Sequence, residues 1–272
     1  MRVPMTLVLT LIASLFLAAP LSAEEAGKPA ATQEIDCGKC HSGLTVRMKV
    51  VHPAIDMGCP ACHSGIADVS KVPHKKTTTF AKGLSADQPD LCYGCHYKSK
   101  FTLKVVHPAI GMGCTSCNNP HASNNEKLLA APVPDLCFTC HDKGEFTRKN
   151  VHPPVESGMC LTCHSPHSSD QQGLLLKPTY EVCFECHEEV SKTPHAVASF
   201  SRGGSGGHVL GIPRKDKERK GAKERKPVMD PKREGKLFSC ASCHNPHSSD
   251  SIRLFRYPAK SPMELCANCH PK

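Results

Sequence analysis

Hydrophobic residues form only one long continuous run in this chain, and that run lies near its start. It extends from Thr6 to Ala19, follows the basic Arg2 and ends at Pro20. A basic residue, a short apolar run and small residues after it are typical of a secretory signal peptide, since about 14 apolar residues fall short of the roughly 20 that a membrane span needs. We therefore expect residues 1–23 to be a signal peptide, with an uncleaved anchor as the alternative. The mature chain is then expected in the periplasm without a transmembrane span, or associated with the outer membrane, or extracellular.

Beyond this run the apolar residues show no long helical or strand pattern. The chain contains 23 Pro and 19 Gly, while aromatic residues amount to 5% of 272 residues and tryptophan is absent. Proline and glycine interrupt long helices and strands, and aromatic side chains supply much of the buried area of an ordinary core. This pattern argues against Rossmann, TIM-barrel and immunoglobulin-type folds. It requires a core that is filled by something other than side chains.

The cysteines indicate what fills the core, because all 18 fall into nine CxxC pairs. Histidine follows eight of the pairs, and Asn118 follows the ninth. CxxCH is the attachment motif of c-type haem: two thiols about one helical turn apart bond the porphyrin, and the histidine can ligate the iron. The predicted attachment residues are Cys37, Cys40, Cys59, Cys62, Cys92, Cys95, Cys137, Cys140, Cys160, Cys163, Cys183, Cys186, Cys240, Cys243, Cys266 and Cys269, and the predicted proximal ligands are His41, His63, His96, His141, His164, His187, His244 and His270.

CxxC pairs have three other uses in proteins. Two pairs can form a zinc centre with four thiolates, an even number of cysteines suits a disulfide scaffold, and a single pair can be a redox dithiol. None of these explains eight histidines at the same position. We therefore expect eight haem c groups, and the sequence leaves open whether Cys114 and Cys117 bind a ninth, remain without haem as a disulfide, or hold a haem with a substitute or missing ligand.

The remaining histidines recur in two short words. A Val-His-Pro word precedes some sites and a Pro-His word follows others, in units of about 45 residues that each carry two sites, which indicates an array of repeats. Histidines at such offsets are predicted to be distal iron ligands, and Met57, Met112 and Met159 are expected to pack against porphyrin faces. The predicted distal ligands are His52, His74, His107, His121, His152, His167, His195 and His247, with His208 in a Gly-rich run as a further candidate.

Two stretches of the chain resemble a known family. Cys160–Ser169, Leu174–Leu176 and Cys183–His187 are similar to the doubled-CXXCH multihaem cytochromes c, and Cys240–Cys269 repeats the pattern. The resemblance implies bis-histidine haems in a chain of mainly irregular coil with short α-helices and little or no β-sheet. It also implies electron transfer in anaerobic respiration, often towards extracellular acceptors. Asn118 departs from the family pattern, which has histidine there.

The repeats and the charge pattern divide the chain into segments. After the signal peptide we expect a flexible segment 24–36, an array of two-haem repeats over 37–200, an insertion over 201–236, and a two-haem segment 237–272 that packs on the array. The net charge is +9, and residues 214–236 hold 11 of the 34 Lys and Arg. This stretch is interpreted as a solvated loop or as a docking arm for an acidic redox partner or for haem propionates. Nucleic acid is not an expected partner.

Two functions compete at this stage. Bis-histidine ligation blocks both faces of an iron, so we expect an electron carrier without catalytic residues. Its expected partners are inner-membrane quinol-linked cytochromes and periplasmic or outer-membrane cytochromes. The alternative is a multihaem reductase of a small oxyanion or nitrogen compound, acting at an open haem on Cys114/Cys117. Haem-based sensing is a further alternative.

Overall fold

The computed structural model describes residues 36–192 and 228–270. The predicted signal peptide, His195 and His208 lie outside the described residues, as does the insertion up to residue 227. In the described ranges no helix has both the length and the apolar content that a bilayer crossing needs.

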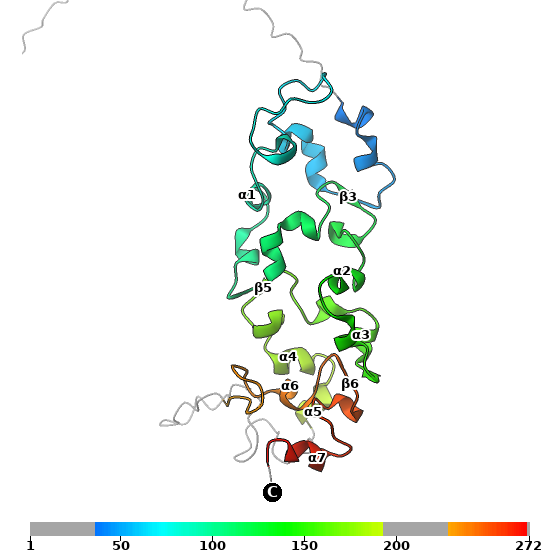
Figure 1. Cartoon of the computed structure of the whole chain (residues 1–272), viewed down its shortest axis with the longest axis vertical. Helices are drawn as coiled ribbons and strands as arrows, with labels where there is room; N and C mark the ends of the chain where they lie inside the picture. Colours follow the sequence, from blue (N-terminus) through cyan, green and yellow to red (C-terminus); the bar gives the residue numbers. More distant parts are fainter. Residues whose placement is uncertain (1–35, 193–227, 271–272) are drawn as a thin grey trace, which may run out of the picture. The chain divides into compact units, whose positions relative to one another are not determined.

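Short elements joined by loops make up the described chain (Figure 1). The α-helices are α1 (Asp90–Tyr93), α2 (Asp135–Phe138), α3 (Pro153–Glu156), α4 (Thr179–Phe184), α5 (Glu188–Lys192), α6 (Cys240–Cys243) and α7 (Pro262–Ala267). The strands are β1 (Val50–Val51), β2 (Val105–Val106), β3 (Ala122–Ser123), β4 (Asn150–Val151), β5 (Ser168–Ser169) and β6 (Ser248–Ser249). Single 3₁₀ turns occupy much of the rest. The predicted fold of coil, short helices and little sheet is confirmed.

The two sequence contexts of the CxxC pairs give two kinds of local structure. The pairs that follow words such as Pro-Asp-Leu begin inside α1, α2, α4 or α7, where an acidic residue in the first turn complements the helix dipole. The pairs that follow a Val-His-Pro word start 3₁₀ turns, Cys59–Ala61, Cys114–Ser116 and Cys160–Thr162. Gly58 and Gly113 precede two of these turns with φ of 83° and 91°, a left-handed conformation that glycine adopts without steric cost.

The strands link one repeat to another. β1 pairs with β3, β2 with β5 and β4 with β6, each antiparallel and only two residues long. In each pair one strand directly precedes a Val-His-Pro histidine and the other directly follows a Pro-His histidine. The C-terminal segment is joined in the same way, since β6 pairs with β4 and α6 packs on α4 (Figure 1).

Apolar burial in the described residues is very small. The buried hydrophobic side chains are Ala122, Phe238, Phe255 and Ala259, whereas Met57, Met112 and Met159 are 67%, 68% and 50% exposed. The buried polar groups are mostly serines that hold loops: Ser123 Oγ donates to the Leu129 carbonyl at 2.5 Å, and Ser169 Oγ and Ser249 Oγ make the equivalent bonds in their repeats. Hydrogen bonds therefore shape these loops, while the apolar surfaces remain to be covered by a bound group.

Candidate haem sites

All nine CxxC pairs have the same backbone turn. At each site the N–H of the residue after the second cysteine donates to the carbonyl of the first cysteine, over 2.9–3.1 Å. The bond from Asn118 to Cys114 is 3.1 Å and that from His63 to Cys59 is 2.9 Å, so the asparagine does not disturb the turn. The turn places both thiols and the following side chain on one side of the chain, as attachment to one porphyrin edge requires.

Six CxxCH histidines each face a second histidine from a distant part of the sequence. The ring centroids are 5.9–6.1 Å apart, and four of the six pairs are close to parallel, with interplanar angles of 8–19°. The pairs are His41–His74, His96–His52, His63–His121, His141–His107, His187–His152 and His164–His247. Each second member belongs to the set that the sequence analysis proposes as distal ligands.

The gap between these rings fits an iron atom. Two metal–nitrogen bonds of about 2 Å each, with a ring radius of about 1 Å on each side, sum to about 6 Å. The observed separations match this sum, so the six pairs have the spacing of two axial ligands on one haem iron.

Backbone carbonyls orient the imidazoles for ligation. Nδ1 of His52 donates to the Pro120 carbonyl at 3.0 Å, and Nδ1 of His107 and His152 donate to the equivalent carbonyls of Pro166 and Pro246. Because a carbonyl can only accept, Nδ1 must carry the proton, and Nε2 keeps the lone pair that binds a metal. The carbonyl of each Pro-His word thus positions a histidine from the strand partner, and in two of the words the histidine itself also faces a CxxCH histidine.

Burial keeps the Pro-His histidines neutral. Desolvation, with a smaller effect of neighbouring histidines, lowers the pKa of His121 and His167, and it lowers the pKa of His247 to about 4. A neutral imidazole at pH 7 can ligate iron without first losing a proton.

A left-handed residue holds the proximal histidine at three of the sites. His63 Nδ1 donates to the carbonyl of Lys82, which has φ of 54°. His164 and His244 make the same bond to Gly173 and Arg253, with φ of 69° and 54°. Non-glycine residues in this region cost about 1–3 kcal/mol, so the fold maintains strain to aim these carbonyls. These left-handed residues were not predicted from the sequence. In three of the loops the left-handed residue directly precedes a leucine, namely Leu128, Leu174 or Leu254.

Asn118 is held by a left-handed loop of the same kind, which we call the Asn118 cradle. Its side-chain amide donates to the carbonyl of Lys127 at 3.0 Å, and Lys127 has φ of 55°. The Asn118 amide therefore takes the place of a histidine Nδ1–H as the donor in this hydrogen bond. It offers no second nitrogen for iron, because the other atom is an amide oxygen.

His167 is the predicted distal ligand that the structure does not place opposite a CxxCH histidine in the described residues. Its ring lies 4.7 Å from the Phe101 ring, as the ring of His247 lies 4.8 Å from Phe146. His167 accepts a backbone hydrogen bond from His107 at 2.8 Å, the counterpart of the bond between His121 and His52. His167 is thus supported in the same way as the other distal ligands, although no CxxCH histidine of the described residues lies opposite its ring.

Thiols of consecutive sites lie next to one another. Cys92 hydrogen-bonds with Cys114, and burial together with this neighbour and Cys62 raises the pKa of Cys92 to about 11. The remaining neighbours are Cys137 with Cys117 and Cys160, Cys163 with Cys186, Cys183 with Cys240, and Cys243 with Cys266 and Cys269. Hydrogen bonds thus join the thiols of three pairs of consecutive sites, and charge interactions between thiols act across the others from Cys62 to Cys269.

An ion pair and hydrogen bonds hold the segment before Cys240 against the Cys240 site. Asp230 is 6% exposed, its carboxylate accepts from Arg233 Nε at 2.6 Å, and the Arg233 guanidinium donates to Ser242 Oγ in α6. Phe238 N–H also donates to the Val228 carbonyl. Residues 228–236, which the sequence analysis groups with the insertion, therefore pack on the C-terminal two-site segment.

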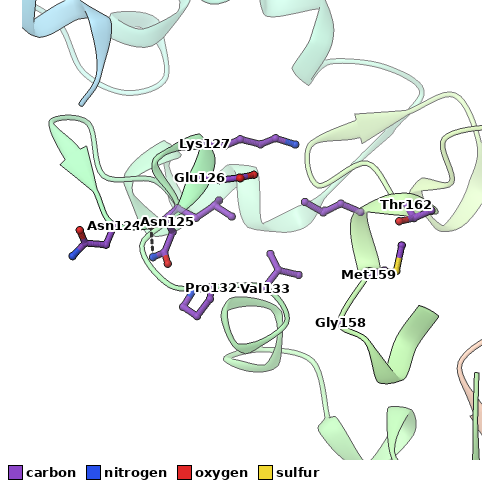
Figure 2. A pocket seen from close by; sticks show the side chains of 11 residues that line it. Asn124, Asn125, Glu126, Lys127, Pro132, Val133, Gly158, Met159 and Thr162 are labelled. Atoms are coloured by element: carbon purple, nitrogen blue, oxygen red, sulfur yellow. Dashed lines mark hydrogen bonds between the residues drawn. The ribbon is translucent and has the colours of Figure 1, made fainter. Parts of the chain in front are cut away.

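A pocket of about 530 Å³ lies beside the Asn118 cradle (Figure 2). Lys127 and Glu126 line one side, and Met159 and Thr162 line the other. Its lining contains no cysteine or histidine, but it includes Leu161 and Thr162, the two residues between Cys160 and Cys163.

Comparison with known proteins identifies the repeats. The family model "Doubled CXXCH motif" matches residues 52–101, 107–146, 152–192 and 230–272, more than half of the chain. No curated protein matches this sequence. Each matched stretch contains two CxxC sites with the geometry described above. The chain therefore belongs to the doubled-CXXCH family of multihaem c-type cytochromes.

Proposed function

We propose that this protein conducts electrons along a series of covalently attached bis-histidine haems, as an exported component of anaerobic respiration. Family membership supports haem c binding and electron transfer. In such proteins the cofactor performs the redox chemistry, and the chain supplies attachment, axial ligands and spacing.

One observation carries the proposal: the attachment thiols of consecutive sites are neighbours. Cys92 with Cys114, Cys137 with Cys160 and Cys183 with Cys240 are within hydrogen-bonding distance. Because each thiol would be bonded to the edge of its own porphyrin in the loaded protein, this arrangement would bring neighbouring haems close together. Such spacing favours rapid electron exchange between one site and the next.

The ligand pairs favour a carrier over an enzyme. At six sites a histidine stands on each side of the iron position, which leaves no coordination position for a substrate. Histidine on both faces also avoids the rise in potential that a methionine ligand causes, so these haems suit low-potential respiration. The proposed location is the periplasm, and the proposed partners are quinol-linked cytochromes of the inner membrane and cytochromes of the periplasm or outer membrane.

Stopped-flow reduction tests the proposal. The oxidised holoprotein is mixed with a reduced small-molecule donor at several concentrations, and the haem absorbance is followed. If electrons redistribute rapidly within the series, every kinetic phase should become faster in proportion to donor concentration. A slow phase that does not depend on the donor would reveal an internal break and contradict the proposal.

A further inference from the structure

We propose that Cys114 and Cys117 hold a haem whose only axial ligand from the protein is His167, so that a coordination position on the Asn118 side is open to a small ligand such as carbon monoxide, nitric oxide or cyanide. This goes beyond electron transfer, because it assigns a ligand-binding site to one member of the series. The argument that the site is loaded rests on the proposed function.

The site retains the parts of a loaded site except one ligand. The turn at Cys114 closes with the same backbone bond as the other eight sites. The loop behind it keeps the left-handed Lys127, whose carbonyl faces residue 118. An asparagine fills the hydrogen-bonding role of the proximal histidine and cannot fill its metal-binding role.

The opposite ligand follows from the pairing rule of the other sites. His63 faces His121, which follows the site at Cys114, and His164 faces His247, which follows the site at Cys240. In both cases the distal histidine follows the CxxC site two places further along the chain. The same step places His167 opposite residue 118. His167 has the same supports as its counterparts, namely a strand partner in His107 and an aromatic neighbour in Phe101.

In the part of the chain that the structure describes, the two histidines that could substitute on the Asn118 side are engaged elsewhere. His107 stands opposite His141 with the rings 8° from parallel, and His121 stands opposite His63. Using either would remove an axial ligand from a neighbouring site. The Asn118 side is therefore the face that stays open.

The position of the site in the series argues that it is loaded. Cys114 neighbours Cys92, and Cys117 neighbours Cys137. A site without haem would leave the haems at Cys92 and Cys137 without a redox group between them. With haem, the site has an electron-carrying neighbour on each side, and a ligand bound to its iron would change the potential of a central member of the series.

Mass and spectroscopy of the purified holoprotein test this proposal. The intact mass should show nine haems, low-temperature electron paramagnetic resonance of the ferric form should show one high-spin haem, and the ferrous form should bind one carbon monoxide per molecule. Asn118→His should keep nine haems and abolish both the high-spin signal and carbon monoxide binding. Asn118→Gln is the matched control: it keeps an amide and should retain both.

Two results would overturn the proposal. A mass of eight haems would mean that the site is not loaded, and nine haems that are all low-spin and do not bind carbon monoxide would mean that another group closes the position. Neither result depends on whether the loaded haems exchange electrons. The stopped-flow phases test that separately, so failure of the open site and failure of the proposed function can be told apart.

Discussion

The backbone N–H of His52 donates to the carbonyl of His121 over 2.8 Å, yet the two imidazoles face different CxxCH histidines. His52 faces His96 and His121 faces His63. One two-residue ladder, β1 with β3, therefore fixes the distal ligands of two sites at once. The same backbone bond joins His107 with His167 and His152 with His247, and the imidazoles of His152 and His247 also face different CxxCH histidines.

This crossing predicts which haem responds to a change at His121. His121→Ala should create one additional high-spin ferric haem, at Cys59/Cys62 rather than at the neighbouring Cys114/Cys117. Adding Cys59→Ala and Cys62→Ala should remove that additional signal from the resonance spectrum.

A signal that survives removal of Cys59 and Cys62 would contradict the pairing. His121→Met serves as the control, because methionine can still ligate iron. This variant should keep the haem low-spin and raise its reduction potential.

The left-handed loops predict opposite effects of glycine at two equivalent positions. Lys127→Gly should leave stability unchanged or raise it by up to about 1 kcal/mol, because glycine adopts positive φ without a steric penalty. Gly173→Ala should lower stability by about 1–2 kcal/mol, because φ there is 69°. Denaturant unfolding of the two holoproteins measures both changes.

Equal stability of Gly173→Ala and the natural protein would show that the carbonyl of residue 173 is not held by a strained backbone. A haem count on each variant should be unchanged, since neither substitution removes a cysteine or a ligand.

The Asp230 contact predicts an acid dependence. Burial would raise the pKa of Asp230, but hydrogen bonds from Ser242, Arg233 and the Lys232 N–H outweigh it and lower the pKa below its usual value. A lowered folded-state pKa stabilises the protein above the ordinary value of about 3.9, and this contribution is lost as pH falls through the folded-state pKa.

Asp230→Asn should therefore lower stability at neutral pH, by about 1–3 kcal/mol, and flatten its decline below about pH 4. The measurement is the denaturant midpoint as a function of pH. Glu234→Gln, at a nearby exposed position, should change neither value. An unchanged pH profile in Asp230→Asn would contradict the role of this carboxylate.

The small buried core predicts that folding requires haem. Only Ala122, Phe238, Phe255 and Ala259 are buried hydrophobic residues in the described ranges, too few to offset the conformational entropy of the chain. The mature chain produced without haem attachment should be disordered by circular dichroism and rapidly cleaved by protease. A compact, protease-resistant form that unfolds cooperatively would contradict this expectation.

Much of the local structure is predictable from the sequence because the chemistry is local. The CxxC spacing requires one helical turn, and all nine sites have it. Proline, glycine and the scarcity of aromatic residues predict coil and short helices, which the structure confirms. The set of histidines opposite CxxCH residues also comes from the candidates that the repeated words supply.

The pairing itself could not be predicted, because it depends on contacts between repeats. Nothing near His121 in the sequence indicates that it faces His63 instead of a residue of its own site. The left-handed Lys82, Lys127 and Arg253 were missed because lysine and arginine rarely adopt positive φ. Their role becomes apparent only in the structure, where the carbonyl of each accepts a hydrogen bond from the side chain that follows a CxxC pair.

Voltammetry of the holoprotein adsorbed on an electrode tests the central claim most directly. Only haems near the electrode can exchange electrons with it, so others contribute charge only if electrons pass along the series. The account predicts that the charge per molecule equals the full haem count at scan rates slow relative to internal transfer, and that Cys137→Ala with Cys140→Ala lowers it by more than one electron. Charge equivalent to one or two haems in the natural protein would contradict it.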